Sequence, residues 1–406
     1  MAIVTSWQTR LLRLFDREKC LICGLAGISL LIHLAVISQI DYFVHDEFYY
    51  VHDAVLIKTG GNGLLSVQPS LGKLFITAGL YTFGFNPWGW RFFSVIFSVA
   101  SVILFYLICR KLGGKKIAFF ASLLFMFENL TFYFSGLGIL DPFSITFMLL
   151  SFLLYLHNRY ALSGASLALS GLCKLPGLFG VLVILGHWLI TRRKLGTRSI
   201  LFFIVALGAT FFLLMPITDF LASGEWLNPF QRVYYLAFKH IGTTITELPP
   251  EARQSLMSPW EWVLKPLSID VDYTNIRLKV LITPTIWALI IPSMGYMLYE
   301  WIKNRRSIAL FTLLWFGSTY VIWIPIALVT HTYTYLYYFL PAMGAVCMSI
   351  GFGLNRIWEI GKTKSTSFGQ LLRVVTIAYL LLHIALFFIF SPLLALVAPH
   401  LLPPPP

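Results

Sequence analysis

Charged residues are scarce in this chain: Asp, Glu, Lys and Arg make up 12% of its 406 residues, about half their share in soluble domains. Hydrophobic residues make up 58%. Apolar runs of about 20 residues, enough to cross the hydrocarbon core of a membrane, recur along the whole sequence. This recurrence excludes a soluble domain behind a single signal peptide. It predicts an all-α integral membrane protein with many spans.

Cysteine is scarce too. The five cysteines (Cys20, Cys23, Cys109, Cys173 and Cys347) lie in or beside apolar runs, so we expect no disulfide framework. Cys20 and Cys23 form a CxxC pair, but without a second pair or nearby histidines the spacing does not favour a zinc site.

Acidic residues are fewer than basic ones, 17 against 30, which gives a net charge of +13. The basic residues gather in short stretches between apolar runs, at 110–116, 192–198 and 303–306. This pattern is typical of cytoplasmic loops and not of a nucleic-acid-binding surface. We therefore predict a multi-pass protein of the cell membrane with a cytoplasmic N-terminus and no nucleic-acid partner.

The apolar runs predict about eleven spans within one transmembrane domain, 1–406. These spans are 20–40, 88–110, 117–134, 142–158, 160–173, 177–191, 199–217, 280–302, 307–329, 333–353 and 370–396. They leave two long outward-facing loops, 41–87 and 218–279. Within the first loop, 73–85 is too short to span and should lie at the membrane interface.

The first outward loop opens with an acidic cluster, DYFVHDEFYYVHD at 41–53. If this stretch is helical, Asp46 and Asp53 lie near one face, as do His45 and His52. A carboxylate whose pKa is raised in a low-dielectric site can take a proton from a hydroxyl, and Asp46 is our candidate for that base. Two other interpretations stay open: a plain solvated loop, and a divalent metal site, which we do not favour.

Several motifs, in order along the chain, resemble the protein O-mannosyltransferase family of GT-C membrane enzymes. HDEF at 45–48 resembles the family's Asp-Glu pair in the first external loop. The other similar segments are QPSLGK at 68–73, NPWGWR at 86–91, ILDPF at 139–143, GLCKLPGLF at 171–179, SPWEWVLKP at 258–266 and YLYYFLPAM at 335–343. Two departures, Gly136 in place of an arginine and Gln68 in place of a histidine, indicate a small, divergent, prokaryotic-type member.

The resemblance implies a GT-C type helical bundle and an activity. The expected reaction is inverting transfer of a mannosyl or similar residue from a polyprenyl or dolichyl phosphate sugar to Ser/Thr hydroxyls of proteins on the outer face of the membrane. Asp46 would be the catalytic base and Glu47 its supporting carboxylate. The expected partners are membrane lipid, the lipid-linked sugar and a protein or peptide acceptor. We expect no required cofactor and no metal ligands.

An anionic lipid phosphate needs cations near the outer interface. The candidates for binding the donor phosphate or sugar are Lys73, Arg91, Asp141, Lys174, Arg232 and Lys239, of which Asp141 and Lys174 rest on the resemblance. Snorkelling to lipid headgroups is the competing explanation for the cations. The candidates for an acceptor or sugar platform are His240, Trp260 and Trp262, although tryptophan also gathers at membrane interfaces without binding sugar.

Three alternatives remain beside this prediction. A related GT-C transferase would glycosylate a lipid or glycan acceptor. A binder of lipid-linked sugars without catalysis would explain the arginine missing at Gly136. A secondary transporter would have a similar number of helices, but it should show an internal repeat and several charges within its spans. We find no repeat and one such charge, Glu128.

Overall fold

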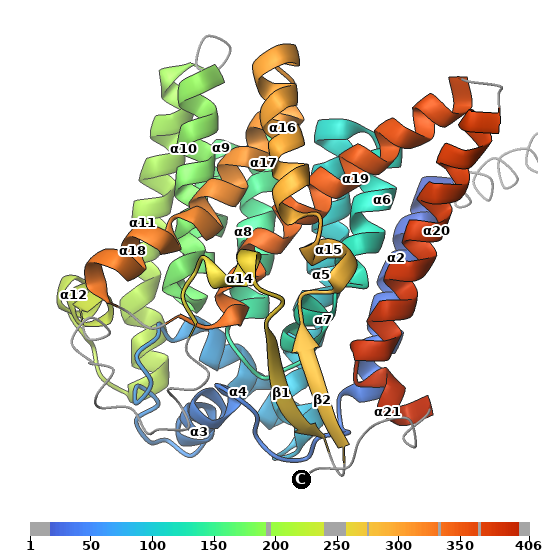
Figure 1. Ribbon diagram of the computed structural model, residues 1–406. Coiled ribbons are helices and arrows are strands. Elements are labelled where there is room, and N and C mark those ends of the chain that lie inside the picture. The colour runs from blue at the N-terminus through green and yellow to red at the C-terminus, as the bar shows by residue number, and fades with distance from the viewer. Residues whose placement is uncertain are drawn as a thin grey trace, which may run out of the picture.

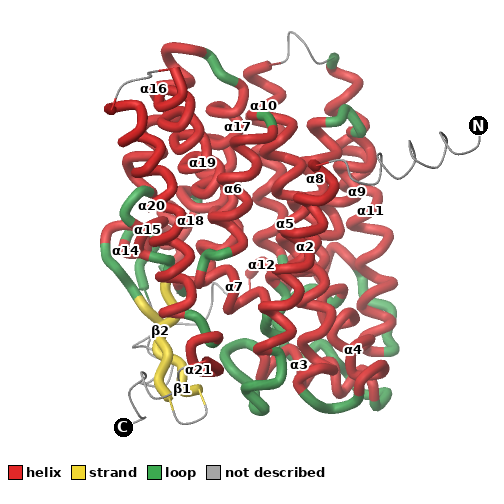
Figure 2. Tube along the Cα trace, turned by 90° about the vertical axis from the view of Figure 1, so that its right-hand side faces the viewer, coloured by secondary structure: helices red, strands yellow, loops and turns green. Residues whose placement is uncertain are grey.

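Helices that run roughly along one axis form most of the molecule (Figures 1 and 2). The computed structural model describes residues 17–191, 196–238, 257–273, 276–331, 334–363 and 367–397. The bundle helices are α2 (Arg17–Val36), α5 (Pro87–Gly113), α6 (Lys115–Met126), α7 (Asn129–Ser135), α8 (Asp141–Leu156), α9 (Tyr160–Cys173), α10 (Gly180–Thr191), α11 (Thr197–Ser223), α16 (Ile290–Asn304), α17 (Ser307–Phe316), α18 (Trp323–Thr330), α19 (Leu340–Thr363) and α20 (Ser367–Phe390). Short turns η1 (Leu175–Phe179), η3 (Gly317–Val321) and η4 (Leu336–Phe339) lie between them.

Each of the predicted spans contains helix, which confirms a helical, multi-pass membrane protein. Within the described ranges, six helical stretches are long and apolar enough to cross a membrane, and α6 with α7 would make a seventh. Helices α8, α9 and α10 have 16, 14 and 12 residues and are short for a span. Length and composition therefore support six or seven crossings.

The bend of 64° between α6 and α7 has a local cause. Glu128 lies at the break, fully buried, and its carboxylate accepts hydrogen bonds from the backbone N–H groups of Leu130 and Thr131, which caps α7. The same carboxylate accepts from the Thr283 N–H at 3.0 Å. Glu128, the charged residue within the third predicted span, thus connects α7 to the segment before α16 through hydrogen bonds.

The smaller elements lie between mid-height and the lower end of the molecule in Figure 1. They are α3 (Glu47–Lys58), α4 (Leu71–Phe83), α12 (Pro229–Phe238), α14 (Glu261–Leu264), α15 (Pro284–Trp287), α21 (Leu393–Val397), β1 (Ser268–Tyr273) and β2 (Ile276–Leu281). The predicted interfacial segment 73–85 is mostly α4. Helix α4 crosses the start of α5 closely, because a Cβ on Gly79 would lie 2.1 Å from the Gly89 carbonyl oxygen.

The second outward loop contains the antiparallel hairpin β1–β2, which the all-α prediction lacks. Val271 pairs with Leu278, and both side chains are buried, as is Val280 two residues further along β2. Burial at alternate residues is the period of a strand and not of a helix. The predicted span 280–302 consequently begins late, because β2 occupies its first two residues and α16 starts at Ile290.

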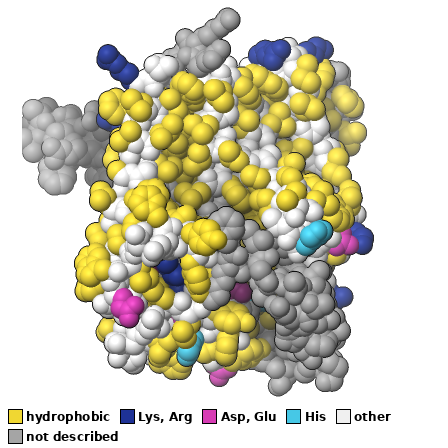
Figure 3. All heavy atoms as spheres, turned by 90° about the vertical axis from the view of Figure 1, so that its left-hand side faces the viewer, with side chains coloured by type: hydrophobic (Ala, Val, Ile, Leu, Met, Phe, Trp, Pro, Cys, Tyr) yellow, Lys and Arg dark blue, Asp and Glu magenta, His cyan; other side chains and the backbone are white. Residues whose placement is uncertain are grey.

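The surface agrees with a membrane orientation. Figure 3 shows hydrophobic side chains over most of the upper and middle part of one face, with Lys and Arg gathered along the upper rim. The loop from α16 to α17, which carries Arg305 and Arg306, lies at that rim, opposite α3 and α4 (Figure 1). Cations concentrate on the cytoplasmic side of membrane proteins, so α3 and α4 belong to the opposite end.

Candidate active site

Asp46 lies immediately before α3, at the end of the bundle that carries α3 and α4, and its side chain is partly exposed. The Tyr337 hydroxyl of η4 donates a hydrogen bond of 3.0 Å to Asp46 Oδ2, and the Tyr50 hydroxyl lies 3.5 Å from the same oxygen. Burial, and then the Asp46 charge, raise the pKa of Tyr50 well above 10, so this phenol remains a donor at neutral pH. The tyrosine hydroxyls therefore hold the Asp46 carboxylate in place, while part of its side chain stays exposed to solvent.

Glu47, the next residue, is fully buried and paired with Arg91 of α5. Both carboxylate oxygens accept from the guanidinium at 2.7 Å, and Glu47 also accepts from the backbone N–H of Gly138 at 2.7 Å. Arg91 donates further to the carbonyls of Ile37 and Ile40. This network fixes the loop that presents Asp46. Arg91, predicted to bind the donor phosphate, is instead 2% exposed and engaged in this bidentate pair.

Lys73 lies in a second buried ion pair, with its ammonium 2.8 Å from Asp53 of α3. It also donates to the carbonyls of Gly63 and Ser66 at 3.2 Å. Burial lowers the pKa of Lys73, while the Asp53 charge acts in the opposite direction. An enclosed lysine with these partners joins α3, α4 and the loop between them. The structure does not place it where a lipid phosphate has access.

Asp141 and Lys174, two predicted donor-site residues, meet although they come from separate helices. Lys174 Nζ donates to Asp141 Oδ2 at 2.7 Å, and both side chains are buried. The ammonium lies 5.2 Å from the ring centre of Tyr337 and 5.6 Å from that of Tyr338. Tyr337 thus touches Lys174 with its ring and Asp46 with its hydroxyl, which brings a cation next to the candidate base.

Arg232 projects from α12 toward the bundle and is 7% exposed. Its Nε donates to Asp219 of α11 at 3.2 Å, and Asp219 also accepts from the Ser70 hydroxyl. The Nη2 atom of Arg232 has no hydrogen-bond partner among the described residues. On the other side of α12, Phe230 and Tyr234 are exposed, as on a helix that lies at a membrane interface. Arg232 therefore has a guanidinium nitrogen left for an anion.

The two tryptophans predicted to form an aromatic platform in the second loop differ in exposure. Trp260 is 39% exposed, whereas Trp262 is completely buried and packs against Tyr320 and Phe339. Trp262 thus forms part of the core in this structure and offers no free ring face to a sugar. Lys239 and His240, the remaining predicted residues, lie outside the described residues.

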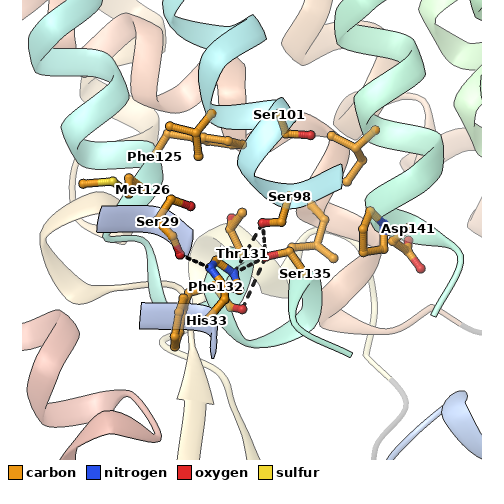
Figure 4. A pocket seen from close by; sticks show the side chains of 14 residues that line it. Ser29, His33, Ser98, Ser101, Phe125, Met126, Thr131, Phe132, Ser135 and Asp141 are labelled. Atoms are coloured by element: carbon orange, nitrogen blue, oxygen red, sulfur yellow. Dashed lines mark hydrogen bonds between the residues drawn. The ribbon is translucent and has the colours of Figure 1, made fainter. Parts of the chain in front are cut away.

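A small cavity lined by both polar and apolar side chains lies next to Asp141 (Figure 4). His33 of α2 contacts the Ser29 carbonyl at 2.7 Å and the Ser135 hydroxyl at 3.1 Å, and Asp141 lines the other end. The cavity measures about 30 Å³, room for about two water molecules but not for a sugar ring. At Gly136, which replaces the family's arginine, an added Cβ would lie 3.6 Å from His33. The imidazole is therefore the side chain nearest to that position, beside the Tyr133 carbonyl oxygen at 3.5 Å.

Sequence reasoning missed the tyrosines. Tyr337 and Tyr338 lie in the motif YLYYFLPAM, yet that run is equally typical of an interface belt, so no role was predicted for either. Asp219 and Ser70, which hold Arg232, were missed as well, because nothing in the sequence marks them. Among the described residues no three His, Cys, Asp or Glu side chains are grouped as a metal site would need.

Comparison with known proteins gives sequence relatives. Residues 30–226 match the family described as dolichyl-phosphate-mannose-protein mannosyltransferase. A polyprenol-phosphate-mannose–protein mannosyltransferase of Corynebacterium glutamicum is 23% identical in an alignment that is 418 residues long with its gaps. This alignment covers 82% of this chain and 78% of that protein. One of Mycolicibacterium smegmatis is 30% identical over 147 residues, which cover 34% of this chain and only 28% of the relative's length.

Solved structures give the fold. The Saccharomyces cerevisiae protein O-mannosyltransferase Pmt1-Pmt2 complex superposes with a TM-score of 0.76 at 12% identity, over 93% of this chain and 90% of that chain. ArnT from Cupriavidus metallidurans superposes with a TM-score of 0.54 at 14% identity, over 89% and 70%. These likenesses establish a GT-C type bundle. In sequence the chain is similar to the dolichyl-phosphate-mannose-protein mannosyltransferase family over residues 30–226, just under half of its length.

Proposed function

We propose that this protein transfers a mannosyl residue from a polyprenyl-phosphate mannose to Ser/Thr hydroxyls of proteins at the outer face of the cell membrane. Curated relatives from C. glutamicum and M. smegmatis carry the name of this activity. The observation that carries the proposal is Asp46, a partly exposed carboxylate held by two tyrosine hydroxyls at the outer end of the bundle. A base that accepts a hydroxyl proton needs this combination of fixed position and access.

In the proposed reaction the acceptor hydroxyl gives its proton to Asp46 as its oxygen bonds to the anomeric carbon. The bond from that carbon to the phosphate oxygen breaks, and its electron pair leaves with the lipid phosphate. A single displacement of this kind inverts the anomeric configuration and needs no covalent enzyme intermediate. Lys174, whose ammonium lies over the Tyr337 ring, is the cation best placed to stabilise the departing phosphate.

The proposal includes a topology of eleven spans with a cytoplasmic N-terminus. Helices α8, α9, α10 and α16 would complete the set, although each is shorter than a typical membrane-spanning helix. Helix α8 is mostly buried among neighbouring helices, which replace lipid contacts, so a short helix is tolerated there. Helices α10 and α16 also expose apolar side chains, as helices in contact with lipid do. Helices α3, α4 and α12 and the β1–β2 hairpin would lie on the outer side, over the headgroups.

The test is a transfer assay. The purified full chain is incubated with radiolabelled polyprenyl-phosphate mannose and a Ser/Thr-rich peptide, and label in the peptide is measured. Asp46→Asn should reduce the rate by about 10²- to 10⁴-fold, the range for loss of a general base. Asp41→Asn, an exposed carboxylate in the same loop, should leave the rate unchanged.

Three outcomes would count against parts of this proposal. Label transfer that survives Asp46→Asn removes Asp46 from the role of base. Transfer to a lipid or glycan acceptor, with none to peptides, supports the related transferase with a different acceptor. Donor binding without any transfer supports a non-catalytic binder.

A further inference from the structure

His45 adopts a backbone conformation that its residue type disfavours. Its φ is +51°, in the left-handed region that glycine occupies readily and that costs other residues roughly 1 kcal/mol or more. The strained residue directly precedes Asp46. The N–H of Glu47 closes the turn by donating to the Val44 carbonyl at 3.1 Å. A glycine would form this turn without strain.

The imidazole lies on an aromatic wall. Its ring centre is 5.1 Å from that of Phe134 and 5.8 Å from that of Tyr133, both buried residues of α7. Phe134 in turn lies 5.1 Å from Tyr337, whose hydroxyl donates to Asp46. His45 and the candidate base are thus held against the same group of rings.

The ring nitrogen Nε2 of His45 is buried and has no hydrogen-bond partner among the described residues. Leaving a buried polar atom unpaired costs about 1–3 kcal/mol, so such an atom is expected where a ligand supplies the partner. Burial lowers the pKa of His45 below 6.5, against the opposing charges of Asp46 and Glu47. The imidazole is therefore neutral at pH 7, and a neutral imidazole exchanges hydrogen bonds with a hydroxyl.

We propose that His45 Nε2 binds a hydroxyl of the sugar carried by the lipid donor, with the Phe134 and Tyr133 rings beside it as an apolar wall. This inference rests on the proposed function and adds a residue for recognition of the sugar. Asp46 is partly exposed, so an acceptor can approach it from solvent, whereas His45 Nε2 is buried and its ring packs against α7. The enclosed side of the base consequently suits the donor sugar better than the acceptor hydroxyl.

The experiment separates the side chain from the backbone. His45→Gly removes the imidazole and relieves the strain, whereas His45→Asn keeps a polar side chain of a type that tolerates positive φ. His331 provides a matched control, because it is a histidine with φ +50° and an exposed side chain. For each full-length variant in nanodiscs, Kd is measured for polyprenyl-phosphate mannose and for the same polyprenyl phosphate without sugar.

His45→Gly should weaken binding of the mannosyl lipid about fivefold, the size of one hydrogen bond, and leave binding of the bare lipid phosphate unchanged. His45→Asn should weaken binding of the mannosyl lipid to a similar extent, because its shorter amide does not reach the position of Nε2, and His331→Gly should stay within about twofold of wild type for both lipids. Thermal unfolding of His45→Gly should occur at the wild-type temperature or above, because a strained backbone has been relieved.

Equal weakening for both lipids, or none for either, would overturn the role of His45. The proposed function is judged separately, by mannose transfer from the wild-type protein. Another result would be that the wild-type protein transfers no mannose while His45→Gly still weakens binding of the mannosyl lipid and not of the bare lipid phosphate. That result would reject the proposed reaction and keep the sugar contact. Absence of wild-type binding to the mannosyl lipid would reject both.

Discussion

The hydroxyl of Tyr337 donates a hydrogen bond to Asp46 across 291 positions of sequence, at 3.0 Å. The same tyrosine ring lies under the Lys174 ammonium. One side chain therefore links the candidate base in the first outward loop to the buried Lys174–Asp141 pair. The predictions below follow from this link and from the ion pairs around it.

Tyr337→Phe removes the hydroxyl and keeps the ring. Loss of one hydrogen bond of about 1–1.5 kcal/mol to a carboxylate should lower kcat about tenfold, because Asp46 is no longer held in one orientation. Donor KM should change little. The measurement is steady-state transfer, with Tyr320→Phe as the control, since Tyr320 packs in the core away from Asp46. An unchanged kcat would show that Asp46 needs no support from Tyr337.

Lys174→Met should affect catalysis and donor binding together. The variant removes the cation beside the proposed phosphate position and leaves Asp141 buried without its partner. We expect kcat/KM for the donor to fall by about tenfold or more, the size of one charge-assisted hydrogen bond. Lys265→Met is the control, because Lys265 belongs to an exposed surface pair of little energetic value. Equal activity of both variants would exclude Lys174 from the phosphate site.

Arg91→Ala should unfold the outer loop more readily. Glu47 would remain buried without its bidentate partner, which costs about 3–5 kcal/mol. The measurement is thermal unfolding in detergent, with the exposed Arg159→Ala as the control, expected to behave as wild type. A double-mutant cycle with Glu47→Ala should give a large coupling energy. Additive effects would mean that the pair does not hold this loop.

Lys73→Met should likewise destabilise the protein, by about 3–5 kcal/mol, because Asp53 loses its buried partner. Adding Asp53→Asn should recover part of the loss, since the amide carries no charge to compensate. If Lys73 binds the donor phosphate instead, the double variant will regain stability without regaining donor affinity. Unfolding curves and donor Kd measured on the same samples distinguish these results.

Chelation tests the metal interpretation. We expect EDTA to leave transfer unchanged, because the buried acidic side chains near the site are already neutralised by Arg91, Lys73, Lys174 and Arg232. The assay is the same label transfer with and without EDTA, followed by addition of Mg²⁺ or Mn²⁺. Activity lost on chelation and restored by a divalent ion would contradict this expectation.

Much of the architecture could be read from the sequence. Long apolar runs must be helical in lipid, because no water is present there to satisfy backbone groups. Basic stretches between them indicate the cytoplasmic side. The short run 73–85 was recognisable as non-spanning from its length. The β1–β2 hairpin was not predicted, since a short stretch of alternating residues before an apolar run is easily joined to that run.

The sequence by itself determined a helical membrane protein and predicted that its acidic loop faces outward, because hydropathy and charge act locally along the chain. Only the tertiary structure decided which carboxylate pairs with which cation. Arg91 and Lys73 look like phosphate ligands in sequence, yet folding places a carboxylate beside each and encloses the pair. Tyr337 carried no signal and became a partner of Asp46, because hydrogen bonds between distant segments depend on how helices pack in three dimensions.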